Sequence, residues 1–535
     1  MEDFAQRRPY NAVSDFVDAN VTRGCGGKRA FDDGTRSLTY GELQDKTFRF
    51  ARALRELGLR PESRIALLLL DTVDFPIAFW GAIRAGVVCI PLNTLLTPEQ
   101  YHYVLEDSRA EALIVSAPLL KTVAPVLAKL PRLRSIIISG NPSDAVSANT
   151  DAVLSFEDLM ARTAPEFATA PTVSDEVAFW LYSSGSTGEP KGAKHVHSSL
   201  MATAKLYGQQ VLGIRESDIV FSAAKLFFAY GLGNAMSFPM SVGATAVLLP
   251  ERPTPEAVFA VLKRERPSIF CGVPTLYAAM LAHPGIGRGV GSDRLRQCIS
   301  AGEALPAELG QRWKDTVGVD ILDGIGSTEM LHIFLSNRPD DIRYGTSGKP
   351  VPGYDAKIVD DEGRELGMGE IGELVVRGPS AAEGYWNQRG RSRRTFAGEW
   401  TYTGDKYVRD AEGYYQYCGR TDDMFKVSGI WVSPFEVEAA LASHEAVLEA
   451  AVIGAVDEDK LVKPKAYVVL KSAIAADERL IESLKAHVKA VAGLWKYPRW
   501  IEFRTELPKT ATGKIQRFKL REESAAQPAS GVKAA

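Results

Sequence analysis

The sequence lacks the features that mark secreted, membrane-spanning and nucleic-acid-binding proteins. Its five cysteines are dispersed along 535 residues with no C-x-x-C spacing, which fits reduced core thiols rather than a disulfide framework or a zinc site. Basic and acidic residues nearly balance, at 63 and 66, so we expect no basic face for nucleic acid. The first ten residues contain no apolar run, and the stretch IALLLL stops at Asp71, well short of a membrane span. We therefore expect a cytoplasmic protein with neither a nucleic-acid nor a membrane partner.

Several common catalytic signatures are also missing. The sequence contains no Walker loop, no kinase signature set and no G-x-S-x-G nucleophile elbow. A different stretch, YSSGSTGEPKG at residues 182–192, follows the apolar run EVAFWLY, and a helix is expected to begin near Ser198. Its glycines allow backbone N–H groups to turn toward an anion, its hydroxyls donate hydrogen bonds, and Lys191 adds a positive charge. Because loops at strand carboxyl ends bind ligands in open α/β sheets, we predict a phosphate site, with a solvated Gly/Ser turn as the alternative.

From residue 64 the chain alternates apolar strand patterns with helix patterns. The order is RIALLLL, TVDFPIAFWGAIRAG, VVCIPL, TPEQYHYVLEDSRA, EALIVS, APLLKTVAPVLAKLP and LRSIIISG, and a polar loop at 141–151 closes this block. A second alternating block runs from ATAVLLP to PAELGQRWKDTVG. Continuous apolar strands between helices indicate buried parallel sheets that helices cover. We predict two stacked α/β subdomains within one large N-terminal domain.

The pattern changes after about Gly345. Short strands and glycine turns in YDAKIVDDEGRELGMGEIGELVVRG predict a small β-barrel or sandwich. Farther on, FEVEAALASHEAV, EAAVIGAV, PKAYVVLK and ERLIESLKAHVKAVA predict a small α+β domain. The predicted class is therefore α/β, with an N-terminal domain at 1–421 (β-rich from about 345), a small mobile C-terminal domain at 422–524 and a disordered tail at 525–535.

Further motifs occupy loops and domain edges. In DGIGSTE, residues 323–329, a carboxylate stands beside hydroxyls that could bind phosphate, an arrangement that suits Mg²⁺, although a helix-capping turn is the alternative. SAGEALP begins at residue 300, YTGD at 402, GRTDD at 419 and PKTATGKIQR at 508. Taken singly, the Asp and Arg residues of these motifs fit surface salt bridges.

Taken together, these motifs have the order and approximate spacing of the adenylate-forming acyl-CoA synthetase superfamily. The resemblance covers residues 10–522, and KLFFAYGLGNAMSFPM with GSTEMLHIF is similar to the benzoate and 4-hydroxybenzoate CoA ligases in particular. It implies an acid–thiol ligase that forms an acyl-adenylate and pyrophosphate from an aromatic acid and ATP, then transfers the acyl group to CoA with release of AMP. The implied ATP-binding residues are Ser183, Ser184, Gly185, Ser186, Thr187, Gly188, Lys191, Gly302, Glu303, Ala304, Asp323, Gly324, Asp405 and Arg420.

The resemblance also assigns the catalytic roles. Thr328 would contact the α-phosphate, Glu329 would hold Mg²⁺, and Lys514 would stabilise the charge that develops during adenylation. Asp422 would be the hinge about which the C-terminal domain rotates, and Gly429 would lie where the pantetheine arm of CoA enters. Lys514 is often acetylated in the resembled family, so a lysine acetyltransferase and a deacetylase are implied partners.

The acid pocket follows from the same resemblance. Its implied residues are Phe228, Ala229, Tyr230, Gly231, Ala301, His332 and Ile333. Aromatic and small residues form a flat slot that suits an aryl ring, and no aspartate near Phe228 is present to pair with an amino acid's ammonium group. A helix-borne His332 with a packing role is the alternative for that residue. The competing functions are a kinase or NTPase that releases ADP, a non-catalytic nucleotide-binding scaffold, and a CoA ligase for cyclohexane or medium-chain carboxylates.

Overall fold

The structure is a computed structural model of the full chain. It describes residues 8–141, 152–183, 190–290, 292–421, 423–427, 430–458, 461–471, 474, 476–493, 496–509 and 515–526. The chain divides into two compact units. Unit 1 comprises 1–355 and 376–401, and unit 2 comprises 356–375 and 402–535. The predicted boundary at residue 421 remains a prediction.

A seven-stranded sheet forms the first half of unit 1. Its order is β7 (Ala152–Ser155), β6 (Ser135–Ser139), β5 (Ala112–Ser116), β3 (Arg64–Leu68), β4 (Val88–Pro91), β8 (Val177–Ser183) and β9 (Lys191–Val196). Neighbouring strands are parallel except for β9, which runs antiparallel to β8. The helices of this half are α1 (Tyr40–Glu56), α2 (Asp74–Arg84), α3 (Pro98–Ser108), α4 (Leu120–Leu127) and α5 (Phe156–Arg162). The strand–helix alternation expected for the first block is confirmed.

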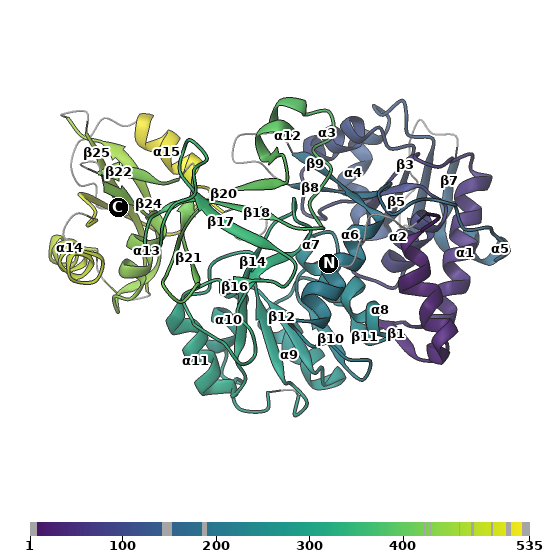
Figure 1. Ribbon diagram of the computed structural model, residues 1–535, viewed down its shortest axis with the longest axis horizontal. Helices are drawn as coiled ribbons and strands as arrows, with labels where there is room; N and C mark the ends of the chain where they lie inside the picture. The colour runs from purple at the N-terminus through teal and green to yellow at the C-terminus, as the bar shows by residue number, and fades with distance from the viewer. Residues whose placement is uncertain are drawn as a thin grey trace. The chain divides into compact units, whose positions relative to one another are not determined.

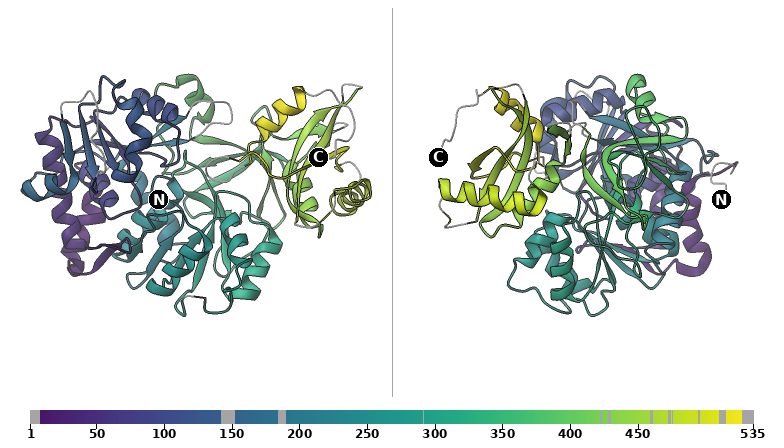
Figure 2. Two further views of the ribbon diagram at one scale, coloured as in Figure 1. Left: turned by 180° about the vertical axis from the view of Figure 1, so that it is seen from behind. Right: turned by 60° about the vertical axis from the view of Figure 1, so that its left-hand side comes forward.

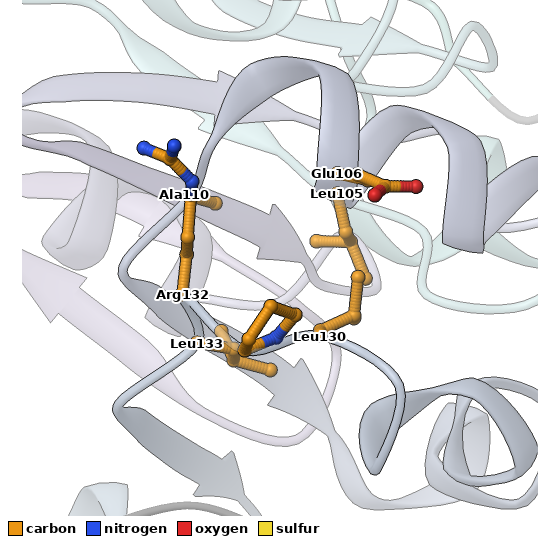
Figure 3. A pocket seen from close by; sticks show the side chains of 7 residues that line it. Leu105, Glu106, Ala110, Leu130, Arg132 and Leu133 are labelled. Atoms are coloured by element: carbon orange, nitrogen blue, oxygen red, sulfur yellow. The ribbon is translucent and has the colours of Figure 1, made fainter.

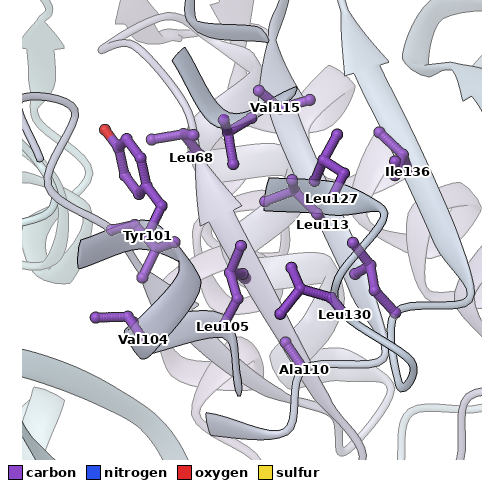
Figure 4. Close-up of a cluster of buried hydrophobic side chains, with 14 of the residues drawn as sticks. Leu68, Tyr101, Val104, Leu105, Ala110, Leu113, Val115, Leu127, Leu130 and Ile136 are labelled. Carbon is purple, nitrogen blue, oxygen red and sulfur yellow. The ribbon is translucent and has the colours of Figure 1, made fainter. Parts of the chain in front are cut away.

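Local sequence signals set the ends of these helices. Thr39 and Glu42 form a capping box at the start of α1, and Thr97 and Gln100 form another at the start of α3. Figure 4 shows side chains of α3 and α4 packed on one face of the seven-stranded sheet in a buried cluster with strand residues. Burying this apolar face is the main source of stability for the half-domain.

A nine-stranded sheet forms the second half of unit 1. Its order is β16 (Lys349–Pro350), β15 (Ile333–Ser336), β14 (Ile321–Gly326), β13 (Gln297–Ser300), β12 (Ile269–Gly272), β10 (Ile219–Ser222), β11 (Thr245–Val247), β1 (Arg29–Asp32) and β2 (Ser37–Thr39). The central strands are parallel, whereas β15, β16 and β2 run antiparallel to their neighbours. Helices α9 (Pro255–Glu265), α10 (Pro274–Leu281) and α11 (Ala307–Val317) pack on one face, as Figure 2 also shows. Helices α6 (His197–Thr203), α7 (Ala229–Leu232) and α8 (Phe238–Val242) lie on the side facing the first sheet (Figure 1).

Unit 2 contains smaller sheets. One sheet lies mostly in unit 2 and contains β17 (Asp355–Val359), β18 (Gly372–Arg377), β20 (Trp400–Arg409) and β21 (Tyr415–Arg420). Strand β19 (Phe396–Ala397), which pairs with the start of β20, belongs to unit 1. The second sheet holds β24 (Val447–Val456), β25 (Val462–Leu470) and β26 (Trp500–Arg504), and its core is shared with α13 (Pro434–Ala442) and α14 (Glu478–Ala492). A hairpin of β22 (Phe425–Val427) and β23 (Ile430–Val432) and the helix α15 (Arg517–Ala526) complete the unit.

One strand was not predicted, and two alternatives drawn from the sequence are wrong. The polar run KGAKHV forms strand β9 between the phosphate loop and α6, because its backbone pairs along β8 despite the polar side chains. Asp323 and Gly324 lie near the end of β14, and Glu329 follows in a turn that starts no helix, so the helix-capping alternative is wrong. His332 is likewise not on a helix: it directly precedes β15, after Leu331 with φ 64°. The predicted polar loop at 141–151 lies almost wholly outside the described residues.

Candidate functional site

The ends of the predicted phosphate loop are fixed by the β8–β9 pairing. Ser183, the last residue of β8, is the register partner of Lys191, the first residue of β9. Ser184, Gly185, Ser186, Thr187 and Gly188 lie outside the described residues, so their roles remain predictions. The β8–β9 pairing nonetheless places Lys191 at the edge of the seven-stranded sheet.

Lys191 contacts Glu329 and Tyr385, and Tyr385 was not predicted from the sequence. The Lys191 ammonium lies 2.8 Å from Oε1 of Glu329 and donates to the Tyr385 hydroxyl over 2.7 Å. The Tyr385 hydroxyl in turn donates to the same Glu329 oxygen at 2.7 Å. Burial would raise the pKa of Glu329, but the charge of Lys191 and the hydrogen bonds from Lys191 and Tyr385 outweigh it and lower the pKa. Glu329 is therefore held as a carboxylate.

The turn that carries Thr328 and Glu329 is held by strand β9. His195 lies flat against Phe179, with ring centroids 5.3 Å apart, and burial lowers its pKa to about 4. The neutral ring uses Nε2–H to donate to the Thr328 carbonyl at 2.8 Å. Thus β9 supplies both the Lys191 cation and an anchor for the turn. His195 was not predicted either, because nothing in KGAKHV marks a contact so distant along the chain.

The predicted adenine residues come together because their strands are neighbours. β13 and β14 are parallel, and Ser300 is the register partner of Asp323. Gly302, Glu303 and Ala304 follow β13 directly, so they lie beside Asp323 and Gly324 at this edge. Gly302 has φ +92°, a left-handed conformation that favours glycine. Burial raises the pKa of Asp323 to about 8, so its side chain is largely protonated at neutral pH.

The predicted acid-pocket residues come from several elements, and their role in substrate binding remains a prediction. Phe228 precedes α7, whose first three residues are Ala229, Tyr230 and Gly231, while Ala301 follows β13 and Ile333 begins β15. The His332 ring is surrounded by the rings of Tyr207, Tyr230 and Phe238 at centroid distances of 5.2, 5.7 and 4.5 Å. Of these three rings only Tyr230 belongs to the predicted pocket, so the contacts show an aromatic environment for His332.

The hydrogen bonding of His332 fixes its tautomer. Burial lowers the pKa of His332 to about 3, so the ring is neutral. Its Nε2–H donates to the Tyr230 carbonyl at 3.2 Å, which leaves Nδ1 as an acceptor. Nδ1 is buried and has no hydrogen-bond partner among the residues that the structure describes.

Gly233, which the sequence analysis did not single out, allows the close packing around His332. A Cβ at Gly233 would lie 2.4 Å from Cδ2 of His332 and 2.8 Å from Phe238, distances that no side chain tolerates. Gly231 is similarly constrained, because a Cβ there would lie 2.0 Å from the Lys225 carbonyl oxygen. Both glycines are thus required by close packing beside His332 and α7.

Asp405 and Arg420 meet within unit 2. They are register partners on β20 and β21, and Nη1 of Arg420 donates to Oδ1 of Asp405 at 3.0 Å. The contact is an ion pair, and the ATP-binding roles of both residues remain predictions. Asp422, Gly429 and Lys514 lie outside the described residues, and their roles remain predictions. The chain on either side of 510–514 is tied together, because Lys509 and Ile515 form a bridge and Gln516 N–H donates to the Pro508 carbonyl at 2.8 Å.

Two cavities are not lined by predicted site residues. One, of about 430 Å³ in unit 2, is lined by Asp360, Asp361, Leu366, Glu370, Ile371, Gly372 and Lys406. Figure 3 shows the other, a cavity of about 40 Å³ between α3 and the segment after α4, and its lining includes none of the predicted site residues. Among the residues described, no group of three or more His, Cys, Asp or Glu side chains could hold a metal ion. No helix in the described ranges is long and apolar enough to cross a bilayer.

Comparisons with known proteins identify the family. The chain matches the model of AMP-binding enzymes over residues 17–386 and that of the AMP-binding enzyme C-terminal domain over 436–514. It is 57% identical over 515 residues to a benzoate–CoA ligase of Thauera aromatica, covering 96% of each chain. It is 56% identical to a 4-hydroxybenzoate–CoA/benzoate–CoA ligase of Rhodopseudomonas palustris, covering 96% of this chain and 94% of that one.

A solved structure shows the same relationship in three dimensions. The benzoate CoA ligase from Burkholderia xenovorans LB400 superposes with a TM-score of 0.87 at 52% identity, covering 96% of this chain and all of that one. The resemblance drawn from the motifs and the predicted fold class are therefore confirmed. This chain belongs to the AMP-binding enzyme family, close to the benzoate and 4-hydroxybenzoate CoA ligases.

Proposed function

We propose that this protein is an AMP-forming aryl-CoA ligase that acts on benzoate and 4-hydroxybenzoate. The observation that carries the proposal is the 57% identity to a benzoate–CoA ligase over nearly the whole of both chains. The surroundings of His332, which combine aromatic rings with two glycines required by close packing, support an aryl substrate. A planar ring needs less depth than a long acyl chain and stacks well on aromatic walls.

The first half-reaction joins the acid to AMP. A carboxylate is a poor acyl donor, so its oxygen attacks the α-phosphorus of ATP, the bond to pyrophosphate breaks, and an acyl-adenylate forms. Two anions approach each other in this step, and cationic groups must stabilise the developing charge. Lys191 supplies one cation at the β8–β9 hairpin, and Lys514 is assigned to supply another from the C-terminal domain.

Glu329 would hold Mg²⁺ together with the phosphates of ATP. Glu329 suits this ion because its side chain is ionised, and Mg²⁺ commonly binds one or two protein carboxylates together with substrate phosphates. When bound, the ion would neutralise phosphate charge and orient the leaving pyrophosphate. For this to happen Lys191 must release Glu329, and the phosphates of ATP provide the competing anion that draws the ammonium group away.

The second half-reaction transfers the acyl group to CoA. The thiol sulfur attacks the acyl carbon, the bond to the AMP oxygen breaks, and the thioester forms while AMP leaves. Rotation about Asp422 would withdraw Lys514 and admit the pantetheine arm beside Gly429. Acetylation of Lys514 would remove the charge that only the first half-reaction uses.

A panel of acids tests the proposal. Benzoate, 4-hydroxybenzoate, cyclohexanecarboxylate and decanoate are each incubated with Mg–ATP, with and without CoA, and pyrophosphate, AMP and ADP are quantified. We expect AMP and pyrophosphate with the two aromatic acids, and multiple turnovers once CoA is present. ADP as the product would indicate a kinase or NTPase, whereas fast turnover of decanoate with inactivity on benzoates would overturn the aryl assignment.

A further inference from the structure

Tyr385 occupies a place in the nucleotide site to which neither the motifs nor the family likeness assigned a role. It lies 194 residues from Lys191 and 56 from Glu329 in sequence, yet its hydroxyl touches the charged groups of both. The three contacts measure 2.8, 2.7 and 2.7 Å and close a triangle. A single tyrosine hydroxyl can accept one hydrogen bond and donate another, so it satisfies both neighbours at once.

The backbone around Tyr385 is attached to the same two elements that carry these groups. Tyr385 forms a bridge with Ala193 of β9, and Trp386 N–H donates to the Gly192 carbonyl at 2.8 Å. Ala382 N–H donates to the carbonyl of Glu329 itself at 2.8 Å. The segment 382–386 therefore fixes the spacing between β9 and the turn that carries Glu329.

The ring and main chain of Tyr385 are held from other directions as well. Its ring lies 5.4 Å from that of Phe396, and the Lys191 ammonium group lies 4.4 Å from its centroid. Its N–H donates to Oγ of Ser392 at 2.9 Å, and only 4% of the residue is exposed. A hydroxyl held so rigidly stays in place when one of its partners moves.

We propose that Tyr385 is a positioning residue of the nucleotide site: its hydroxyl holds Lys191 and Glu329 together before ATP binds, and keeps the Glu329 carboxylate oriented after Lys191 turns to the phosphates. The inference rests on the proposed function, in which Lys191 and Glu329 serve Mg–ATP. Once Lys191 leaves, Glu329 loses its cation partner but retains the Tyr385 hydrogen bond. Tyr385 thus acts through Glu329 and touches neither the acid nor CoA.

Tyr385→Phe is the direct test, because it removes the hydroxyl and keeps the ring. A hydrogen bond to a charged group is typically worth a tenfold to hundredfold change in an equilibrium. We expect the dissociation constant of a non-hydrolysable ATP analogue, measured by calorimetry in Mg²⁺, to rise by about tenfold or more. The Mg²⁺ concentration that half-saturates this binding should rise as well. Adenylate formation should fall in parallel, whereas thiolation of a supplied benzoyl-adenylate should stay within about twofold.

Tyr344→Phe is the matched control. Tyr344 also lies in unit 1 and donates to a carboxylate, Oδ1 of Asp320, at 2.7 Å. Asp320 precedes β14, whereas Thr328 and Glu329 follow that strand, so the control removes an equivalent hydrogen bond away from the site. It should leave analogue affinity, Mg²⁺ dependence and both half-reactions unchanged.

A second variant tests the proposal even if Tyr385→Phe misfolds. Ser392→Ala loosens the Tyr385 main chain without removing the hydroxyl, and should change analogue affinity in the same direction by a smaller factor. Unchanged analogue affinity and Mg²⁺ dependence in a folded Tyr385→Phe protein would overturn the proposal. Equal losses in adenylation and thiolation would do so too, since they indicate a general packing role. Inactive wild-type protein on every acid would instead refute the proposed function.

Discussion

The Lys191–Glu329 ion pair provides a quantitative test of the site before any ligand binds. The two groups are 2.8 Å apart, and their side chains are only 19% and 14% exposed. Removing one partner of a buried pair costs about 3–5 kcal/mol, because a charge is left in a poorly solvated place. Residual exposure and the hydrogen bond from Tyr385 relieve part of that cost, so we expect Lys191→Met to lower the free energy of unfolding by about 2–3 kcal/mol.

A double-mutant cycle measures the coupling directly. Urea unfolding of the nucleotide-free protein is followed for Lys191→Met, Glu329→Gln and the double variant. Because the double variant removes both charges, it should be more stable than the sum of the single losses predicts, by about 1–2 kcal/mol. Arg52→Met is the control: Arg52 and Glu56 also lie 2.8 Å apart in unit 1, but their side chains are 38% and 55% exposed, and we expect no measurable change. Additive losses, or a loss for Arg52→Met equal to that for Lys191→Met, would refute the reasoning.

Three further predictions concern the substrate, acid stability and the catalytic lysine. His332→Ala should reduce kcat/KM for 4-hydroxybenzoate more than for benzoate, by roughly tenfold to a hundredfold, because Nδ1 can accept from a para hydroxyl; equal losses would assign His332 to packing. His197 is buried and its pKa is lowered to about 4, so its stabilising effect is present above the unfolded pKa of about 6.5 and is lost as pH falls toward 4. Between pH 7 and pH 5 this amounts to about 2 kcal/mol in the free energy of unfolding, and His197→Gln should show a correspondingly smaller drop in urea titrations at the two pH values; an identical drop would contradict it. Lys514→Ala should nearly abolish adenylate formation yet spare thiolation of a supplied acyl-adenylate, and equal loss of both rates would argue against domain alternation.

Most of the architecture could be predicted because strand and helix periods differ. The apolar run ALIV within EALIVS lies in buried β5, and the helix of TPEQYHYVLEDSRA begins after its Thr97 cap. Strand β9 was not predicted because KGAKHV is rich in polar residues, and its strand conformation depends on backbone pairing with β8 and with the segment around Tyr385. The position of His332 outside a helix was not predicted either, because the turn before it depends on a left-handed conformation of Leu331 that no sequence pattern indicates.

The site could be predicted only where its residues lie in recognisable motifs. Lys191 and Glu329 were both expected at the nucleotide site and lie in direct contact, which their motifs did not predict. Contacts between distant parts of the chain explain the roles of Tyr385, His195 and Gly233. Local sequence patterns do not predict such contacts. The distances from Tyr385 to its partners depend on the backbone hydrogen bonds of segment 382–386, which the local sequence does not specify.

If the acid is activated by attack on the α-phosphorus of ATP, one of its oxygens must pass to AMP, and isotope labelling detects that transfer. Benzoate labelled with ¹⁸O in both carboxylate oxygens is converted with ATP, Mg²⁺ and CoA, and the nucleotide product is analysed by mass spectrometry. Since the acyl–oxygen bond breaks in the second half-reaction, we expect AMP carrying one ¹⁸O atom, with unlabelled pyrophosphate. ADP as the nucleotide product, with the label in inorganic phosphate, would contradict it.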